Sequence, residues 1–261
     1  MKSKRGAIIF LPKNRKGQLT IFIIIAMVIV AVGILIYSFW PQIKSVLGGE
    51  AGNPQAFIQG CVEKEIEDAV EIISLQGGSV EPDSFYTYEG NKIEYLCYQN
   101  QGYASYCVVQ QPFLKQHIES EIKNEIADAV ESCFESMRES FERRGYDVVL
   151  TDGDFNIELL PKRIAATFNR ELTLTRGDSE RYEEFVVVLN NNLYELTAIA
   201  NSIIDWEAKY GDAETTLYMS FYHDLKVEKF KQTDDTKIYV ITDRNSGDKF
   251  QFASRSRIYE L

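Results

Sequence analysis

The 261-residue sequence has few of the side chains on which enzyme and metal sites depend. It contains two histidines, His117 and His223, and four cysteines, none of them in a CxxC spacing. A paired set of histidine ligands, an HExxH motif, a GxSxG nucleophile turn and a glycine-rich phosphate loop are all missing from it. The sequence therefore predicts no enzyme activity, no cofactor and no metal site.

The remaining candidates for a chemical site have simpler explanations. His223 is followed by Asp224, as in an acid–base pair, but no nucleophile motif accompanies it, so we interpret it as a histidine on a strand surface. His117 stands among polar neighbours at a helix start and is interpreted as solvated. Residues 152–154 and 243–248 alternate oxygen-bearing side chains as calcium loops do. Neither has the twelve-residue pattern with a closing glutamate, so both are interpreted as turns.

Charged side chains are missing from residues 19–40, whose sequence is LTIFIIIAMVIVAVGILIYSFW. At about 1.5 Å of rise per residue, a helix of this length spans roughly 33 Å, which matches a bilayer core of about 30 Å. An isolated span must be helical, because every backbone polar group in lipid needs an internal partner. The run predicts one transmembrane helix and the lipid bilayer as a partner.

Charge predicts the orientation of that helix. Six basic residues precede it and no acidic one does: Lys2, Lys4, Arg5, Lys13, Arg15 and Lys16. Positive flanks stay in the cytoplasm, so we expect residues 1–18 inside and the long C-terminal part outside the plasma membrane. Removing these six leaves 22 Lys and Arg against 39 Asp and Glu, a net charge of −17. Such a surface excludes nucleic acid as a partner and favours basic or cationic ones.

The residues around the start of the run, KNRKGQLT at positions 13–20, resemble the class III signal peptides of archaeal prepilins and archaellins. The following letters, IFIIIAMVIVAVGI, are also similar to an archaellin N-terminal helix. The resemblance implies that a prepilin-type peptidase cuts between Gly17 and Gln18 and that the apolar helix is retained. It covers about the first 25 residues, and Phe22 stands where many pilins carry a glutamate. The alternative is an uncleaved signal anchor.

Two functions are compatible with this organisation. The first is a non-enzymatic, single-pass, membrane-anchored extracytoplasmic protein, pilin-like or a structural component of the cell surface. Its membrane helices would self-associate through the small residues Ala26, Ala31 and Gly33. The alternative is a monomeric surface binding or adhesion module that recognises a protein or a cationic ligand.

All four cysteines lie in the exported part, where an oxidising environment favours disulfides over the rival interpretation, zinc. Four cysteines allow three pairings. Cys97 and Cys107 are about equally far from a predicted turn and should face each other across a hairpin. Cys61 and Cys133 fall on the apolar stripes of two predicted helices and should link them.

Periodicity predicts the fold class α+β, with amphipathic helices packed on antiparallel sheet. A linker at 41–54 precedes a helix–hairpin–helix region at 55–145 and an antiparallel α+β region at 146–261. Helices are expected from residue 55 to the glycines at 77 and 78, from 112 to 145 and from 192 to 210. The tripeptide 176–178 is interpreted as a hairpin turn. Strands are expected at 85–88, 91–98, 103–109, 147–150, 156–160, 163–168, 171–175, 184–189, 216–231, 237–242 and 249–254.

Overall fold

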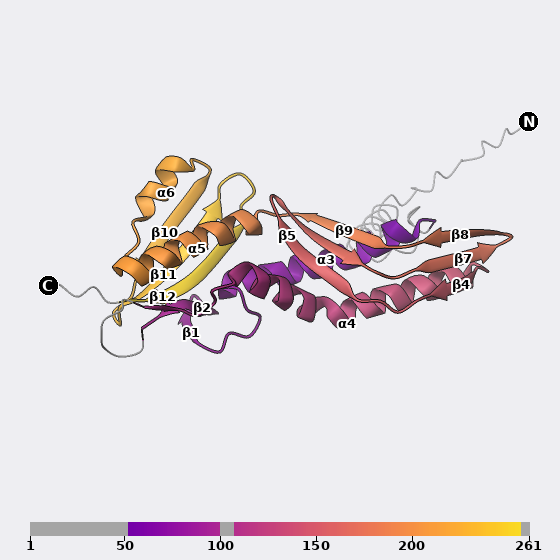
Figure 1. Cartoon of the computed structure of the whole chain (residues 1–261), viewed down its shortest axis with the longest axis horizontal. Coiled ribbons are helices and arrows are strands. Elements are labelled where there is room, and N and C mark those ends of the chain that lie inside the picture. The colour runs from indigo at the N-terminus through magenta and orange to yellow at the C-terminus, as the bar shows by residue number, and fades with distance from the viewer. Residues whose placement is uncertain (1–51, 100–106, 257–261) are drawn as a thin grey trace, which may run out of the picture. The chain divides into compact units, whose positions relative to one another are not determined.

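A computed structural model describes residues 52–99 and 107–256 (Figure 1). The chain divides into two compact units, residues 1–52 and 53–261, and the description below concerns the second. The predicted leader, the membrane span and nearly all of the linker lie outside the described residues. Within the described ranges, every helix falls short of the combination of length and apolar character that a membrane span requires.

Helix α3 (Pro54–Gln76) begins the described fold and ends where the sequence predicts. The Asn53 side chain caps its start by accepting a hydrogen bond from the backbone of Gln55, and proline occupies the first turn. Gly77 ends it in the left-handed conformation, at φ 87°. A side chain at Gly77 would also meet the Cβ of Glu94 at 2.9 Å, so this glycine is required both for its backbone angle and for close packing.

Helix α4 (Leu114–Arg143) packs along α3, and both bury a stripe of apolar side chains at helical spacing. A disulfide joins Cys61 on α3 to Cys133 on α4, with 6.0 Å between their Cα atoms. This is the helix–helix link expected from the sequence. The prediction that α4 begins at residue 112 is two residues early, because Pro112 and Phe113 precede the first helical turn.

The second disulfide joins Cys97 to Cys107, with 5.5 Å between the Cα atoms. The pairing is the one expected, but its geometry is not. In the register between β2 (Asn91–Tyr98) and β3 (Val108–Val109), Cys97 lies opposite Val109 rather than Cys107. The bond therefore runs diagonally, from the ladder to the residue just before β3. The rest of the predicted strand 103–109, up to residue 106, lies outside the described residues.

Two three-stranded antiparallel sheets follow α4. One has the order β4–β7–β8, from β4 (Asp147–Leu150), β7 (Leu172–Arg176) and β8 (Asp178–Tyr182). The other has the order β5–β6–β9, from β5 (Phe155–Leu160), β6 (Arg163–Phe168) and β9 (Phe185–Asn190), and lies against α3 and α4. The predicted turn at 176–178 joins β7 to β8. Strand β8 was not predicted, because none of its five residues is buried and no apolar alternation marks it.

A six-stranded sheet contains strands from both regions that the sequence predicts. Its order is β1 (Phe85–Tyr88), β2, β12 (Lys249–Arg255), β11 (Thr236–Asp243) and β10 (Leu225–Lys231), with β3 beside β2. Strand β12 pairs with β2 in parallel, and the remaining pairs are antiparallel. The fold class is therefore α+β with sheets that are mainly antiparallel. One continuous cluster of buried side chains joins α3, α4, α5 and all three sheets.

Helices α5 (Leu193–Tyr210) and α6 (Thr215–Phe221) pack against this sheet, α5 mainly on β12 and β11, α6 on β10 (Figure 1). The prediction of one strand at 216–231 is wrong, since α6 occupies its first part and β10 begins at Leu225. Two local features explain this helix. Glu214 caps α6 by accepting a hydrogen bond from the backbone of Thr216. No residue of α6 is buried, so the sequence TTLYMSF, although rich in residues that favour strands, has no alternation of buried and exposed side chains.

Candidate functional site

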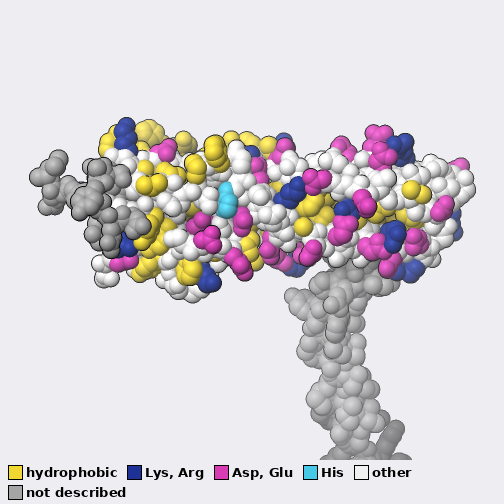
Figure 2. Space-filling view, turned by 60° about the horizontal axis from the view of Figure 1, so that its bottom comes forward, with side chains coloured by type: hydrophobic (Ala, Val, Ile, Leu, Met, Phe, Trp, Pro, Cys, Tyr) yellow, Lys and Arg dark blue, Asp and Glu magenta, His cyan; other side chains and the backbone are white. Residues whose placement is uncertain are grey.

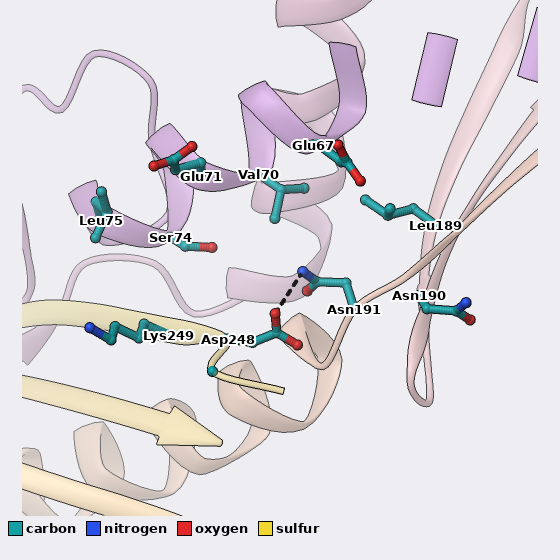
Figure 3. Close-up of a pocket in the computed structure, with 11 residues that line it drawn as sticks. Glu67, Val70, Glu71, Ser74, Leu75, Leu189, Asn190, Asn191, Asp248 and Lys249 are labelled. Atoms are coloured by element: carbon teal, nitrogen blue, oxygen red, sulfur yellow. Dashed lines mark hydrogen bonds between the residues drawn. The ribbon is translucent and has the colours of Figure 1, made fainter. Parts of the chain in front are cut away.

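A cleft of about 580 Å³ lies between three segments that are far apart in the sequence (Figure 3). One wall is the C-terminal half of α3. The opposite side is formed by the end of β9 with the residues that lead into α5, and by the turn between β11 and β12. Because α3 packs on both β9 and β12, the position of the three walls is determined by the main core.

The interior of the cleft combines apolar surface with one hydroxyl. Val70 and Leu189 are 4% and 7% exposed, and Leu75 is half-buried beside them. Ser74 is 7% exposed, and its hydroxyl is directed into the cleft (Figure 3). The site can therefore accept a ligand that has an apolar stem and a polar group.

Two carboxylates line the α3 side of the cleft. Glu67 and Glu71 lie one helical turn apart, both are exposed, and neither forms an ion pair or hydrogen bond within the described part of the chain. Two other acidic side chains of α3 are engaged, because Glu63 accepts a hydrogen bond from Gln59 and Asp68 pairs with Lys64. Glu67 and Glu71 thus bring to the cleft two carboxylates without a close partner among the described residues.

Asp248, on the facing turn, is already satisfied. It accepts hydrogen bonds from the backbone of Asn192 at 2.9 Å, from the Ser246 hydroxyl at 2.8 Å and from the Asn191 side chain at 3.5 Å. These bonds hold the β11–β12 turn against the start of α5. The segment 243–248 is a turn, as predicted, and among the described residues no group of three or more His, Cys, Asp and Glu is placed to hold a metal ion.

His117 is not the solvated residue that the sequence indicates. It is half-buried, and its Nε2 lies 2.8 Å from the Ser79 hydroxyl, which donates to the buried Glu94 carboxylate at 2.5 Å. Burial raises the pKa of Glu94. In a nucleophile triad the histidine lies between serine and carboxylate, whereas here the serine lies between them. The group therefore links α4 and β2 to the turn after α3, and no sequence motif marks it.

His223 is exposed and lies in the turn between α6 and β10, not on a strand as predicted. Its backbone carbonyl accepts a hydrogen bond from Arg244 at 3.4 Å. The position follows from the wrong strand prediction for residues 216–231.

A buried ionic network fastens α5 to the six-stranded sheet. Glu207 is completely buried and accepts hydrogen bonds from Lys237 at 2.8 Å and from Tyr239 at 2.5 Å. Ser254 and Ser256 donate to the same carboxylate. Burial beside Glu207 raises the pKa of Tyr239 far above its usual range. Since the members bond to one another inside the core, the network has a structural role.

A second cleft, of about 340 Å³, lies where α4 meets β4 and the β6–β7 connection. Arg170 crosses it to form a two-pronged ion pair with Glu131, and its guanidinium stacks 4.7 Å from the centre of the Phe134 ring. The hydrogen bond from Arg170 lowers the pKa of Glu131. Both arginines of this cleft are paired, Arg170 with Glu131 and Arg138 with Glu135, whereas Glu67 and Glu71 of the larger cleft have no such pair among the described residues.

The surface carries two further patterns. Figure 2 shows one face of the molecule, on which acidic side chains outnumber basic ones and hydrophobic side chains gather toward the six-stranded sheet. Large apolar side chains are also exposed on α5 and α6 and just after α6: Trp206, Tyr210, Leu217, Phe221 and Tyr222. The acidic excess agrees with the charge balance of the sequence.

The fold and the cleft define a disulfide-bonded α+β protein with an acidic, partly apolar surface cleft. Comparison of the chain with protein-family models, with curated proteins and with solved structures yields no match. Functional inference for this chain therefore depends on its own residues and their geometry.

Proposed function

We propose that this protein is a non-enzymatic, single-pass, membrane-anchored extracytoplasmic protein of the pilin-like or cell-surface structural type. Residues 19–40 anchor it in the plasma membrane, with the N-terminus in the cytoplasm. The observation that carries the proposal is the pair of disulfides in residues 53–256, since such bonds persist in oxidising compartments. The apolar run and its basic flank supply the anchor.

The attachment of α3 supports a structural role. This helix is the first described element after the predicted linker, so force from an anchor would enter the fold through it. Gln55 and Gln59 lie one turn apart and hydrogen-bond through their side-chain amides to the backbone of Val186 and Val188. These hydrogen bonds satisfy backbone groups on the outer edge of β9, which lies at the edge of its sheet and would otherwise expose those groups.

The disulfide strengthens the same end of α3. Cys61 lies about two turns into the helix, two residues after Gln59, and its bond to Cys133 ties α3 covalently to α4. The start of α3 is therefore held on one side by a sheet edge and on the other by a cross-link. This arrangement suits a segment that transmits tension between a membrane helix and a folded body.

Processing at Gly17–Gln18 by a prepilin-type peptidase, and association of membrane helices through Ala26, Ala31 and Gly33, belong to the same proposal. Mass spectrometry of the N-terminus of protein purified from its native membrane tests it. We expect a mature chain that begins at Gln18, and a Gly17→Val variant that keeps the leader. A wild-type chain that retains Met1 or Lys2 would contradict peptidase processing and leave a signal anchor.

The location is tested separately. Peptide mapping of native protein without reductant should recover the Cys61–Cys133 and Cys97–Cys107 cross-links, and protease added to intact cells should digest the part after residue 40. Free thiols at all four positions, together with full protection from protease, would overturn the extracytoplasmic assignment.

The second candidate, a monomeric surface binding module, is favoured by the cleft and its unpaired Glu67 and Glu71. Light scattering of detergent-extracted protein distinguishes the two functions. A defined oligomer that is lost in a Gly33→Ile variant supports assembly through the membrane helix. If the wild-type protein and the Gly33→Ile variant are both monomers, the binding module is supported.

A further inference from the structure

We infer that the cleft between α3 and the β11–β12 turn binds an alkylammonium group, the chemistry shared by a polyamine and a lysine side chain. The inference deepens the binding-module candidate and rests on it. It is independent of membrane anchoring and of leader processing, because the residues that carry it all lie in the folded unit after residue 52.

The Ser74 hydroxyl is the first observation. Helical serines commonly donate to the carbonyl four residues earlier, as Ser132 and Ser220 do in this chain. Ser74 is 93% buried, yet its hydroxyl forms no hydrogen bond with any described residue. In the described part of the chain no enclosed side-chain oxygen lacks a hydrogen-bond partner, so the Ser74 oxygen is accessible from the cleft although most of the residue is buried. Because it is open to the cleft, a ligand in the cleft can supply the partner (Figure 3).

The charge of the lining is the second observation. The described lining includes three carboxylates, those of Glu67, Glu71 and Asp248, and one basic residue, Lys249. Asp248 is engaged by the start of α5, so the free negative charge belongs to the two glutamates. Like charges four residues apart destabilise a helix, and a cation between them removes that cost. The lining therefore repels anions and attracts cations.

The shape and the apolar surface select the kind of cation. Val70, Leu75 and Leu189 offer apolar contacts to a methylene chain of the sort that lysine and polyamines carry. A bare metal ion needs several oxygen ligands converging on one point, and the described residues contain no such group. An ammonium with three N–H donors matches the unpaired hydroxyl and the two carboxylates.

Isothermal titration of the full chain in detergent micelles tests the inference, with two probes. Spermidine represents the polyamine source, and an acetylated lysine amide represents a protein side chain. We expect saturable binding of at least one probe with one site per chain. The Glu67→Gln/Glu71→Gln variant should bind at least about tenfold more weakly, since each charge-assisted hydrogen bond contributes about a factor of ten or more. Ser74→Ala should weaken binding by about threefold to tenfold.

A matched control separates the cleft from general acidity. Glu125→Gln/Asp128→Asn removes the same charge from exposed side chains of α4 that do not line the cleft, and should change the affinity by less than about twofold because exposed charges outside the site are screened by solvent and salt. Unchanged thermal unfolding of Ser74→Ala shows that its loss of affinity is not a folding defect. If the control weakens binding as much as the cleft variant does, or if neither probe binds, the inference is overturned.

The two probes also identify the source of the ammonium group. Binding of spermidine alone supports a free polyamine, and binding of the lysine amide supports a partner protein. Either result leaves the mass of the N-terminus and the oligomeric state undecided, so a failure here is distinguishable from a failure of the anchoring proposal. Binding of a neutral polyol such as sorbitol with equal affinity would contradict recognition by charge.

Discussion

The two disulfides should contribute unequally to stability, because they close loops of very different length. Cys61 and Cys133 are 72 residues apart in the sequence, whereas Cys97 and Cys107 are 10 apart. In the chain-entropy description, a cross-link stabilises the native state by restricting the unfolded chain, and the effect grows with the logarithm of the loop length. The helix–helix link should therefore be the more important of the two.

The expected magnitudes follow from those separations. The entropy relation gives about 4.4 kcal/mol at 25 °C for the long loop and about 2.7 kcal/mol for the short one. For a folded part of roughly 200 residues, each kcal/mol corresponds to about 2 to 4 °C in Tm. Loss of the long link should thus lower Tm by about 9 to 18 °C, and loss of the short link by about 5 to 11 °C.

Alanine substitution alone would confuse this comparison, because Cys97, Cys107 and Cys133 are buried and truncation leaves cavities. Two variants avoid the difficulty. Cys97→Ala/Cys107→Ala keeps only the long link, and Cys61→Ala/Cys133→Ala keeps only the short one. Each is unfolded in urea with and without reductant, so that oxidised and reduced forms share every side chain.

We expect the reductant to lower the free energy of unfolding by about 4.4 kcal/mol in the first variant and about 2.7 kcal/mol in the second. The ordering is the sharper test, since real disulfides depart from the calculated values. Equal losses, or a larger loss for the short loop, would refute the chain-entropy reasoning. They would show instead that native packing of α3 on α4 and β9 already accounts for the stability of this region.

Two further predictions concern buried charges. Lys237→Met should destabilise the protein by about 3 to 5 kcal/mol in urea unfolding, because it removes the ammonium group that forms the ion pair with the buried Glu207 carboxylate. The double variant Glu207→Gln/Lys237→Met should recover part of that loss, and no recovery would contradict the explanation. Glu94→Gln should gain stability relative to wild type as pH rises above about 4. Burial raises the pKa of Glu94, so the native state binds the proton more tightly and wild type loses stability through that window. Urea midpoints that differ by a constant amount between pH 4 and pH 8 would contradict this.

Much of the secondary structure was predictable because its signals are local. The long helices α3 and α4 carry apolar residues at three- and four-residue spacing, and α3 has proline at its start and glycine at its end. Most strands after residue 146 show alternation with turn residues between them. Where local signals were weak the prediction was wrong, as for α6 and β8, neither of which has a buried residue.

The pairing of strands was not predictable from local pattern. Strand β2 lies in the first half of the chain, yet its parallel neighbour β12 is formed by the last described residues. The group of Ser79, Glu94 and His117 depends on the same long-range contact between β2, α4 and the turn after α3. Neither could be found from sequence spacing, because periodicity shows which face of an element is buried but not which element covers it.

The sequence by itself determined the apolar run at 19–40, the acidic character of the part that follows, the main helices and the choice of cysteine partners. These depend on composition and on neighbours a few residues away. The tertiary structure alone decided the mixed six-stranded sheet and the cleft, whose α3 wall is more than 100 positions away in the sequence from the other two walls. It also decided which polar groups lack a partner. Glu67, Glu71 and Ser74 look like ordinary helix residues in the sequence, and they became a candidate site because packing placed them around one cleft without satisfying them.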